Sequence, residues 1–375
     1  QGGYIDPEEF IEFDPNELKD EQVPEVSSEC IEEVITRINN SQRPVLYVGS
    51  AIHSTNTVDL MRKVADKLGI PVVVAYDATD LMPYENDLYA GIGGLLGDRG
   101  GNWTVQNSDL ILSVGCRLSC RQVGYNVKSW AREAYVMMVD IDKYELIKPS
   151  IHVEMPIHAD AKDFLEKMDA RLTQPLTRHE EWLDTCRTWK KNYPVVTEKH
   201  YKNEGLANCF LNEVSRRADE DQYIVLGNGT VEACLHAIYI KEHTRLLCNS
   251  GAASMGYDLP AAIGCCFAIG KKNTICLTGD GSIQMNLQEL QTIVFHKLPI
   301  KIFVVNNQGY HSMRQTEGNL FPEYTKVGVG PESGDLSFPE MKKIAGAYGI
   351  PYMSASSNAE LPDVIEKMLH MDGYA

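Results

Sequence analysis

The sequence contains no apolar run long enough to cross a membrane. A transmembrane helix needs about 18 or more predominantly apolar residues in a row, and none of the 375 residues belongs to such a run. The chain opens with an acidic segment, residues 1–22, where a secretory leader would place a basic stretch followed by an apolar one. We therefore expect neither a membrane protein nor a secreted one.

Basic residues are scarce relative to acidic ones. The chain has 35 Lys and Arg against 52 Asp and Glu, which gives a formal net charge of −17. A surface so rich in negative charge disfavours nucleic acid and favours solubility. An anionic ligand would then need backbone amides or a metal ion to hold it.

The cysteines lack the spacing of a metal site or a disulfide framework. There are ten. Cys116 and Cys120 are four residues apart without a second metal-ligand pair, and the adjacent Cys265 and Cys266 follow no ligand spacing, so a zinc site is not expected. Several of the others lie inside apolar runs, where cysteine acts as a small buried hydrophobe. This usage is typical of a reducing compartment, so we predict a cytoplasmic protein without structural disulfides.

What the sequence does contain is a strong functional signal in residues 278–310. A β-branched run at 274–278 predicts a buried strand that stops at Gly279-Asp280-Gly281. The glycines permit a tight turn and close approach of the backbone. Ser282 then opens a helical pattern whose first amides would face the turn, an arrangement that attracts phosphate.

A second apolar run, 302–305, ends at Asn306-Asn307. A right-handed crossover would set the two strand ends side by side, so we expect Asp280 and Asn307 to converge. With the Gly309 carbonyl they form a hard oxygen site that suits Mg²⁺ and leaves room for phosphate oxygens. We call residues 278–310 the clamp. The alternative is an ordinary βαβ unit whose polar turn residues only cap its strands.

The GDG triplet followed by NN resembles the signature of thiamine-diphosphate enzymes. Residues 250–264 look like the segment that holds the aminopyrimidine ring in the acetolactate synthase superfamily, with Met255 at the bulky position under the bent cofactor; the alternative is a core-filling methionine. Residues 227–230, after a predicted strand at 222–226, resemble the first diphosphate-contacting turn. The resemblance implies cofactor contacts at Gly227, Asn228, Gly229, Ala253, Met255, Gly279, Asp280, Gly281, Ser282, Asn307, Gly309 and Tyr310, with Asp280, Asn307 and Gly309 on the metal.

The middle of the chain resembles the part of acetolactate synthases that binds flavin adenine dinucleotide. Arginines suit a pyrophosphate, and acids at strand ends suit a ribose. The sequence departs from the family at Ser119-Cys120, where many relatives carry two acids. The alternative is a structural spacer with a vestigial cleft. The candidate flavin residues are Gly49, Ser50, Leu96, Gly97, Gly115, Arg117, Arg121, Asp140, Asp142 and Asp160.

Alternating strand and helix patterns predict an α/β protein with two doubly wound parallel-sheet domains. The resemblance implies that the first is a Rossmann-like central domain and that the second is a thiamine-diphosphate-binding domain. We expect a linker at 1–28, the central domain at 29–175, a linker at 176–202 and the second domain at 203–375. In the central domain the patterns predict strands at 43–48, 71–75, 110–114 and 134–141 and a helix at 57–68.

The resemblance also implies what lies outside this chain. In such enzymes a glutamate from a preceding pyrimidine-binding domain activates the cofactor, so we expect no catalytic residue here. The expectation is a fragment cut at both ends, inactive alone and a homodimer or homotetramer when full length. The alternative is a natural subunit that receives its carboxylate from a partner.

The implied reaction is decarboxylation of a 2-oxo acid, foremost pyruvate, and addition of the remainder to an acceptor carbonyl. Thr316 stands where acetolactate synthases hold a tryptophan, which weakens a strict assignment. His311 and Arg314 would recognise a carboxylate or sugar hydroxyls, or belong to a solvated loop. The alternatives are a related lyase with another 2-oxo acid or acceptor, and a non-catalytic nucleotide-binding module.

Overall fold

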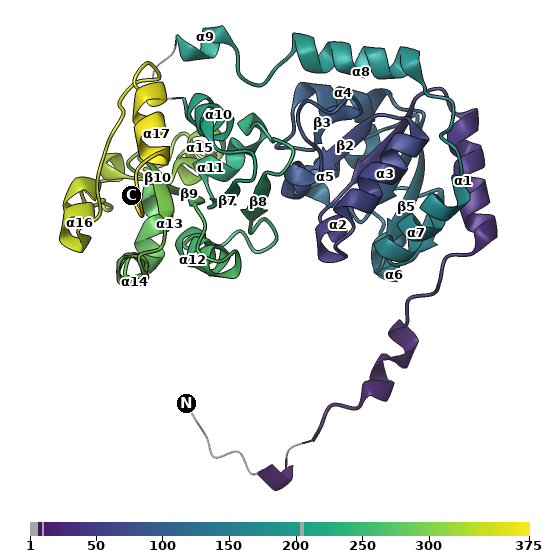
Figure 1. The fold of residues 1–375 in the computed structure, drawn as a ribbon, viewed down its shortest axis with the longest axis horizontal. Coiled ribbons are helices and arrows are strands. Elements are labelled where there is room, and N and C mark those ends of the chain that lie inside the picture. Colours follow the sequence, from purple (N-terminus) through teal and green to yellow (C-terminus); the bar gives the residue numbers. More distant parts are fainter. Residues whose placement is uncertain (1–6, 10, 203–205) are drawn as a thin grey trace.

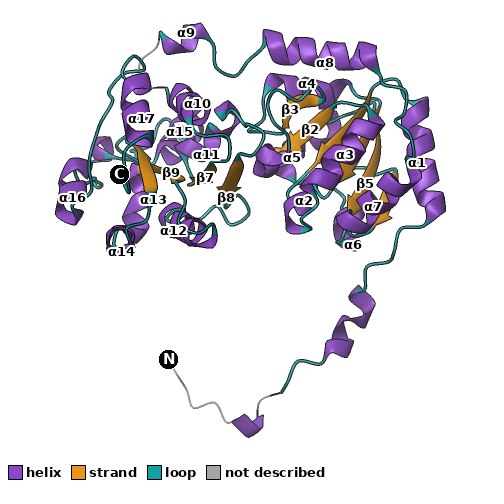
Figure 2. Ribbon diagram, viewed as in Figure 1, coloured by secondary structure: helices purple, strands orange, loops and turns teal. Residues whose placement is uncertain are grey.

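The computed structural model describes residues 7–9, 11–202 and 206–375. Two α/β units lie side by side, and the N-terminal extension leads away from them (Figure 1). One unit is built on a six-stranded sheet and the other on a four-stranded sheet, and all paired strands are parallel. Helices surround both sheets (Figure 2). The predicted fold class is confirmed.

The first sheet has the order β3-β2-β1-β4-β5-β6. Its central strand is buried at every position, which suits a sheet covered by helices on both faces. The strands are β1 (Pro44–Val48), β2 (Val72–Ala75), β3 (Tyr89–Gly93), β4 (Leu110–Val114), β5 (Tyr135–Asp140) and β6 (Met155–His158). The α-helices are α1 (Ser28–Asn40), α2 (Ala51–Ser54), α3 (Val58–Leu68), α4 (Arg99–Asn107), α5 (Cys120–Val123), α6 (Lys143–Leu146) and α7 (Ala161–Arg171).

The second sheet has the order β10-β9-β7-β8. At its outer edge the Ala375 amide donates to the Ile300 carbonyl at 3.1 Å, and the Ile302 amide donates to the Ala375 carbonyl at 2.7 Å. The strands are β7 (Tyr223–Leu226), β8 (Arg245–Cys248), β9 (Thr274–Gly279) and β10 (Ile300–Val305). The α-helices are α10 (Ala207–Arg217), α11 (Thr230–Ala233), α12 (Asp258–Ala268), α13 (Asp280–Ile283), α14 (Glu289–His296), α15 (His311–Leu320), α16 (Met341–Tyr348) and α17 (Leu361–Leu369).

The stretch predicted as the second linker contains two helices, α8 (Glu180–Asn192) and α9 (Glu198–Tyr201). Helix α8 packs on the first unit: the Trp182 indole donates to the Pro44 carbonyl at 3.1 Å, and the rings of Trp103 and Trp189 lie 5.9 Å apart. The exposed face of α8 is polar, and for that reason the sequence looked like a linker. Its tryptophans face the first unit and pack against it.

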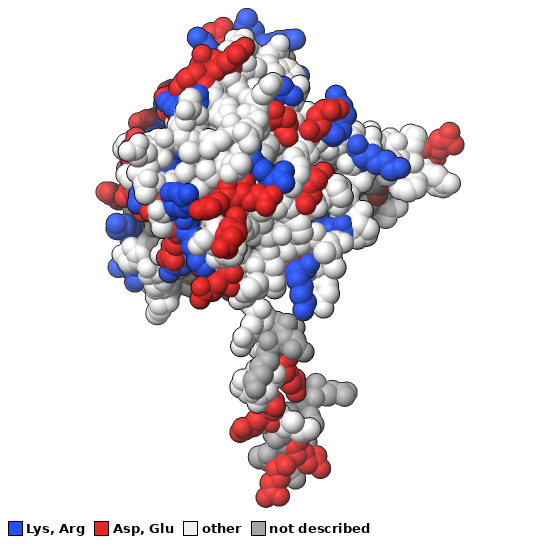
Figure 3. Space-filling model, turned by 90° about the vertical axis from the view of Figure 1, so that its right-hand side faces the viewer, with Lys and Arg blue, Asp and Glu red and all other residues white. Residues whose placement is uncertain are grey.

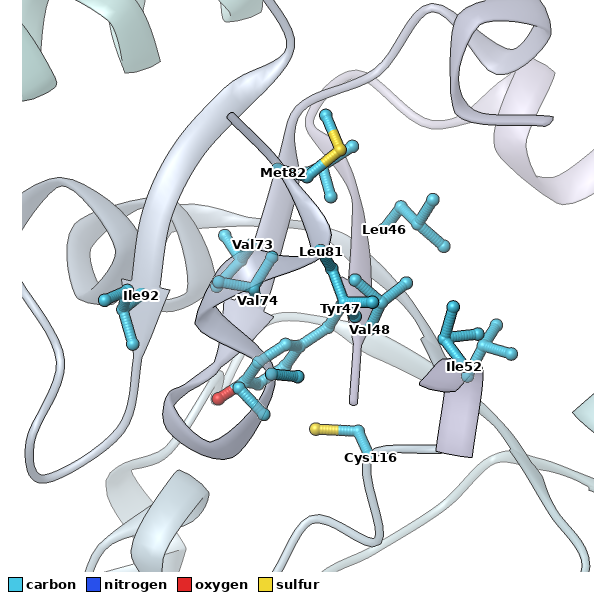
Figure 4. Packing of buried hydrophobic residues seen from close by; sticks show 14 of the residues in the cluster. Leu46, Tyr47, Val48, Ile52, Val73, Val74, Leu81, Met82, Ile92 and Cys116 are labelled. Atoms are coloured by element: carbon cyan, nitrogen blue, oxygen red, sulfur yellow. The ribbon is translucent and has the colours of Figure 1, made fainter. Parts of the chain in front are cut away.

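The core of the first unit forms around β1. Leu46, Tyr47 and Val48 pack with Val73 and Val74 of β2 (Figure 4). Tyr47 is fully buried. A Cβ at Gly93 of β3 would lie 2.5 Å from the Tyr47 hydroxyl oxygen, so only glycine leaves room for this ring.

The two units meet through the 3₁₀ segment Tyr76–Leu81 of the first and β8 of the second. The Asp80 side chain, 2% exposed, accepts from the Leu246 amide at 2.9 Å and pairs with His53 at 2.8 Å and with Arg245. Burial alone would raise the pKa of Asp80, but the His53 hydrogen bond and the Arg245 charge outweigh it and hold the pKa below its usual value. Asp80 is therefore a buried ionic tie between the units.

The exposed charged side chains reflect the excess of acidic over basic residues in the sequence. Acidic side chains gather on the N-terminal extension, which includes the 3₁₀ turns Pro7–Glu9 and Pro15–Glu21, and both signs are interspersed on the face shown in Figure 3. Throughout the described ranges, no helix is both long enough and apolar enough to span a bilayer.

Candidate functional site

The three candidate turns of the second unit follow neighbouring strands. The Gly227-Asn228-Gly229 turn leaves β7, the Gly279–Ser282 turn leaves β9, and residues 306–310 leave β10. The registers align these ends, because Leu226 lies opposite Leu277 and Val305 lies opposite Gly279. The structure thus brings the three turns to the carboxyl edge of one sheet, where α/β proteins bind ligands.

Asp280 lies at the centre of this edge with only 3% of its surface exposed. The Gly281 amide donates to its Oδ1 at 2.9 Å, and the Gly309 amide donates to its Oδ2 at 3.3 Å. Burial raises the pKa of Asp280, and the amides of Gly281, Gln308 and Gly309 partly offset that rise. A cation bound at this carboxylate would compensate the desolvation that the amides leave uncompensated.

The two polar atoms of the Asn307 side chain differ: its Nδ2 atom has a hydrogen-bond partner and its Oδ1 atom has none among the described residues. Its Nδ2 donates to the Thr230 hydroxyl at 2.9 Å, which joins the ends of β10 and β7. Its Oδ1 is buried and accepts no hydrogen bond from any described residue. Buried oxygens of this kind are rare and call for a partner. A carboxylate and an amide oxygen are donors that Mg²⁺ accepts, so these residues fit the predicted metal.

Ser282 uses its hydroxyl inside the protein. The hydroxyl donates to Asp258 at 2.7 Å and accepts from the Gly256 amide at 2.8 Å. Ser282 could offer a diphosphate either its hydroxyl or its backbone amide, and these two hydrogen bonds leave the amide as the available group. The remaining contacts predicted for the clamp stay predictions.

Gly281 packs directly under the ring of Tyr310. A Cβ built at Gly281 would lie 2.4 Å from the Tyr310 Cε1 atom, which no real contact allows. The Tyr310 ring also packs edge-on against the Phe338 ring, with the ring centroids 5.7 Å apart, so a methyl group at position 281 would push Tyr310 into a neighbour.

Gly281→Ala is therefore expected to weaken thiamine diphosphate binding about tenfold, the scale of disturbing a group that supports a metal ligand. The measurement is a titration of thiamine diphosphate at fixed Mg²⁺. Gly264→Ala is the control, because nothing lies within 4 Å of its Cβ position in α12. Equal affinity in both variants would contradict the role given to Tyr310.

Residues 249–258 form a connected second segment. Asn228 donates to the Ser254 carbonyl at 2.9 Å, which ties this segment to the β7 turn. Ala253 adopts a left-handed conformation with φ 50°, and its amide donates to the Asn249 carbonyl at 2.8 Å. Met255 is 42% exposed, so the core-filling alternative does not describe it. Its place beneath a cofactor remains a prediction.

In the first unit, the two arginines predicted for flavin are each held by acids. Arg117 pairs with Glu145 at 2.7 Å. Arg121 donates to the Tyr76 hydroxyl at 2.5 Å and pairs with Glu232 of the second unit at 3.1 Å. Burial raises the pKa of Glu232, and Arg121 partly offsets the rise. If the central domain is a structural spacer, these arginines are expected to form surface or interdomain ion pairs, and the contacts match that alternative more directly than they indicate a pyrophosphate site.

The other flavin candidates also have partners within the protein. Ser50 donates to Asp77 at 3.1 Å, Asp140 accepts from the Asp142 amide at 2.9 Å, and burial raises the pKa of Asp140. The Asp142 carboxylate caps α6, the Asp160 carboxylate caps α7, Leu96 is half-buried, and Gly49, Gly97 and Gly115 are enclosed by neighbouring atoms. Flavin binding thus stays a prediction that the geometry neither requires nor tests.

Two residues that build the site, Thr230 and Asp258, were not among the predicted contacts, although they lie inside the segments 227–230 and 250–264 that the resemblance singled out. Thr230 holds Asn307, and the fully buried Asp258 joins Thr278 to Ser282. Asp258 is an acid at the start of the apolar helix α12, and that position was the available signal. Acids are common in the first turn of helices, so an acid at this position does not by itself indicate a site residue.

The fold and this edge define an α/β protein whose second sheet carries a candidate cofactor site at its carboxyl edge. Residues 227–375 match the family described as "Thiamine pyrophosphate enzyme, C-terminal TPP binding domain", and residues 31–168 match "Thiamine pyrophosphate enzyme, central domain". The chain belongs to the thiamine pyrophosphate enzyme family and carries its central and C-terminal domains.

Curated relatives agree with this family. The chain is 30% identical over 352 residues to the acetolactate synthase large subunit of Cyanidium caldarium, covering 92% of this chain and 58% of that protein. It is 27% identical over 373 residues to the isozyme 1 large subunit of Escherichia coli (strain K12), covering 97% and 63%. The match to chloroplastic acetolactate synthase 1 of Zea mays is 29% over 357 residues, covering 92% and 55%. The chain thus spans between half and two thirds of the length of these relatives.

Proposed function

We propose that this chain binds thiamine diphosphate through Mg²⁺ held by Asp280, Asn307 and the Gly309 carbonyl. In the whole protein it would serve decarboxylation of a 2-oxo acid, foremost pyruvate, with transfer of the remaining carbons to an acceptor carbonyl. The observation that carries the proposal is the buried, unpartnered Asn307 Oδ1 at the same sheet edge as the desolvated Asp280 carboxylate. This edge belongs to the part that matches a thiamine pyrophosphate-binding domain.

The residues of this chain bind and orient rather than transfer protons. Asp280 and Asn307 would fix the metal, and the turns after β7 and β9 would receive the diphosphate oxygens. Met255 would support the ring system from below. Thiamine diphosphate, when bound, supplies the carbon centre that adds to the 2-oxo carbonyl and accepts the electron pair released with carbon dioxide.

The acceptor carbonyl would meet the segment after Gly309, which contains Arg314 and Thr316. Arg314 pairs with Glu332 and donates to the Gln308 carbonyl at 3.4 Å and the Val329 carbonyl at 3.3 Å, so it supports the loop that carries Gly309. Thr316 donates to the Ser312 carbonyl at 3.0 Å within α15. Neither contact singles out an acceptor, and a related lyase that uses another 2-oxo acid or aldehyde is the second candidate.

The proposal is tested on the full-length protein with pyruvate and a panel of carbonyl acceptors, by measuring carbon dioxide release and identifying the products. Release that requires both Mg²⁺ and thiamine diphosphate is the expected result. If no 2-oxo acid yields carbon dioxide, the decarboxylation proposal fails. Nucleotide binding without any response to thiamine diphosphate would favour the non-catalytic module.

Three further expectations belong to the same proposal. Flavin would show as a bound yellow cofactor after incubation with flavin adenine dinucleotide, and its absence at high flavin concentration would end that expectation. Cytoplasmic localisation is supported by ten cysteines that are all free thiols in the structure. Assembly into a homodimer or homotetramer is proposed for the full-length protein.

A further inference from the structure

A buried carboxylate outside the predicted contact set connects the parts of the cofactor site. Asp258 opens α12 and its side chain is fully buried. Its Oδ2 accepts from the Thr278 hydroxyl at 2.6 Å and from the Ser282 hydroxyl at 2.7 Å, and its Oδ1 accepts from the Leu259 amide at 2.9 Å. Thr278 ends the apolar run of β9 and Ser282 follows the GDG triplet, so one carboxylate holds both sides of that turn.

The same carboxylate lies against the turn that follows β7. A Cβ at Gly227 would lie 2.2 Å from the Asp258 Oδ2 atom and 3.1 Å from its Cβ atom. The Asp258 side chain thus occupies the space that any side chain at position 227 would need. Gly227 is a glycine here because of this contact, since its backbone does not adopt a left-handed conformation.

A third connection runs through Ser282 to the Met255 segment. While its hydroxyl donates to Asp258, it accepts from the Gly256 amide at 2.8 Å. The Gly256 carbonyl accepts from the Asn286 side chain at 2.7 Å, so Gly256 is held on both sides. Asp258 and its hydroxyl partners therefore contact the β7 turn, the β9 turn and the segment that ends at Asp258 itself.

The free-energy cost of burying the Asp258 carboxylate indicates that its hydrogen bonds have a role beyond packing. A fully buried carboxylate is costly unless hydrogen bonds satisfy it. Bonds to a charged acceptor are shorter and about twice as strong as neutral ones, and the hydroxyl bonds at 2.6 Å and 2.7 Å are of this short kind. A core held only by packing would not need them, whereas a site whose turns must keep a fixed relative position gains directional contacts.

We propose that Asp258 is a positioning residue of the cofactor site: through Thr278 and Ser282 it fixes the Asp280 turn relative to the Met255 segment and the Gly227 turn. The inference rests on the proposed function and deepens it, because it assigns the alignment of the metal and ring contacts to a residue that touches neither.

Asp258→Asn tests the proposal. The asparagine keeps the shape and one acceptor oxygen, but it places a donor where two hydroxyls now donate. The dissociation constant of thiamine diphosphate at saturating Mg²⁺ is expected to rise about tenfold, as for other groups that orient metal ligands. Ile263→Ala is the matched control, since Ile263 is buried in the same helix. It should lower Tm while keeping the dissociation constant of the folded protein.

Ser282→Ala and the double variant with Asp258→Asn complete a mutant cycle. If Asp258 acts through Ser282, the two losses overlap, and the double variant binds only slightly more weakly than the weaker single variant. Should Asp258→Asn fail to fold, Ser282→Ala and Thr278→Val carry the same test, because each removes one hydroxyl donor of Asp258.

The outcomes separate the two levels of proposal. A wild-type protein that binds no thiamine diphosphate overturns the proposed function. A wild type that binds, together with a folded Asp258→Asn that binds equally well, overturns the positioning role alone. If Ile263→Ala has the same Tm as Asp258→Asn and loses as much affinity for thiamine diphosphate, the positioning role is also overturned. The loss of affinity would then follow from lower overall stability.

Discussion

Asp280→Ala is expected to raise the dissociation constant of thiamine diphosphate in the presence of Mg²⁺ by about 100-fold or more. Even groups that only orient a metal ligand contribute about 10–100-fold, and Asp280 is the proposed ligand itself. The measurement is a calorimetric titration of the cofactor at fixed Mg²⁺, repeated after chelation. Chelation of the wild type should reproduce the loss.

Asp221→Ala is the control for this variant. Asp221 is exposed at the entrance to β7, in the same domain, and the substitution makes the same change in charge. Because burial already disfavours the Asp280 carboxylate, Asp280→Ala should leave the Tm of the metal-free protein unchanged or higher. Retained Mg²⁺-dependent binding in a folded Asp280→Ala protein would refute the metal site.

Asp80→Ala is expected to lower the free energy of unfolding by about 3–5 kcal/mol, the scale of breaking a buried ion pair by removing one partner. The loss leaves Arg245 and His53 without their shared carboxylate at the boundary of the two units. Chemical denaturation followed by tryptophan fluorescence measures it. Glu242→Ala is the matched control: it removes an exposed partner of Arg62 at the same boundary, and should cost less than about 1 kcal/mol.

The same residue predicts a pH dependence. The pKa of Asp80 is lowered in the folded protein, so its contribution is fully present above the unfolded value near 3.8 and is lost as the pH falls through the folded value. The difference in unfolding free energy between wild type and Asp80→Ala should therefore shrink on acidification below about pH 4. A difference that stays constant there would contradict the ionic tie.

The strands that the sequence predicted well are those with buried β-branched runs. The predicted strand 43–48 corresponds to β1, 71–75 to β2 and 110–114 to β4, each within one residue at its start. Three strands were not predicted: β3 (YAGIG), β6 (MPIH) and β8 (RLLC). These are short or glycine-rich, and they form because neighbouring strands offer an edge, which no local pattern encodes.

In the candidate site, too, local patterns were predictable from the sequence and long-range contacts were not. Strand order and handedness predicted that Asp280 and Asn307 converge. The structure aligns the ends of β9 and β10, and the Gly309 amide donates to the Asp280 Oδ2 atom at 3.3 Å. The convergence of Asp280 with Asn307 itself stays a prediction. The ion-pair partners of the two arginines could not be predicted from the sequence, because Glu145 is 28 residues from Arg117 along the chain and Glu232 is 111 residues from Arg121. The first pair forms within the first unit and the second forms across the two units. Both depend on tertiary packing, which the spacing within a motif does not determine.

The bond between Arg121 and Glu232 has a thermodynamic consequence. Glu232 belongs to α11, directly after the Gly227–Gly229 turn, whereas Arg121 belongs to α5 of the first unit and also donates to the Tyr76 hydroxyl there. Any ligand of the first unit that drew Arg121 away from Glu232 would change the environment of that turn. By reciprocity, a ligand at the turn would then shift the affinity of the first unit by the same factor. The ion pair is thus a contact through which binding events in the two units would be thermodynamically linked.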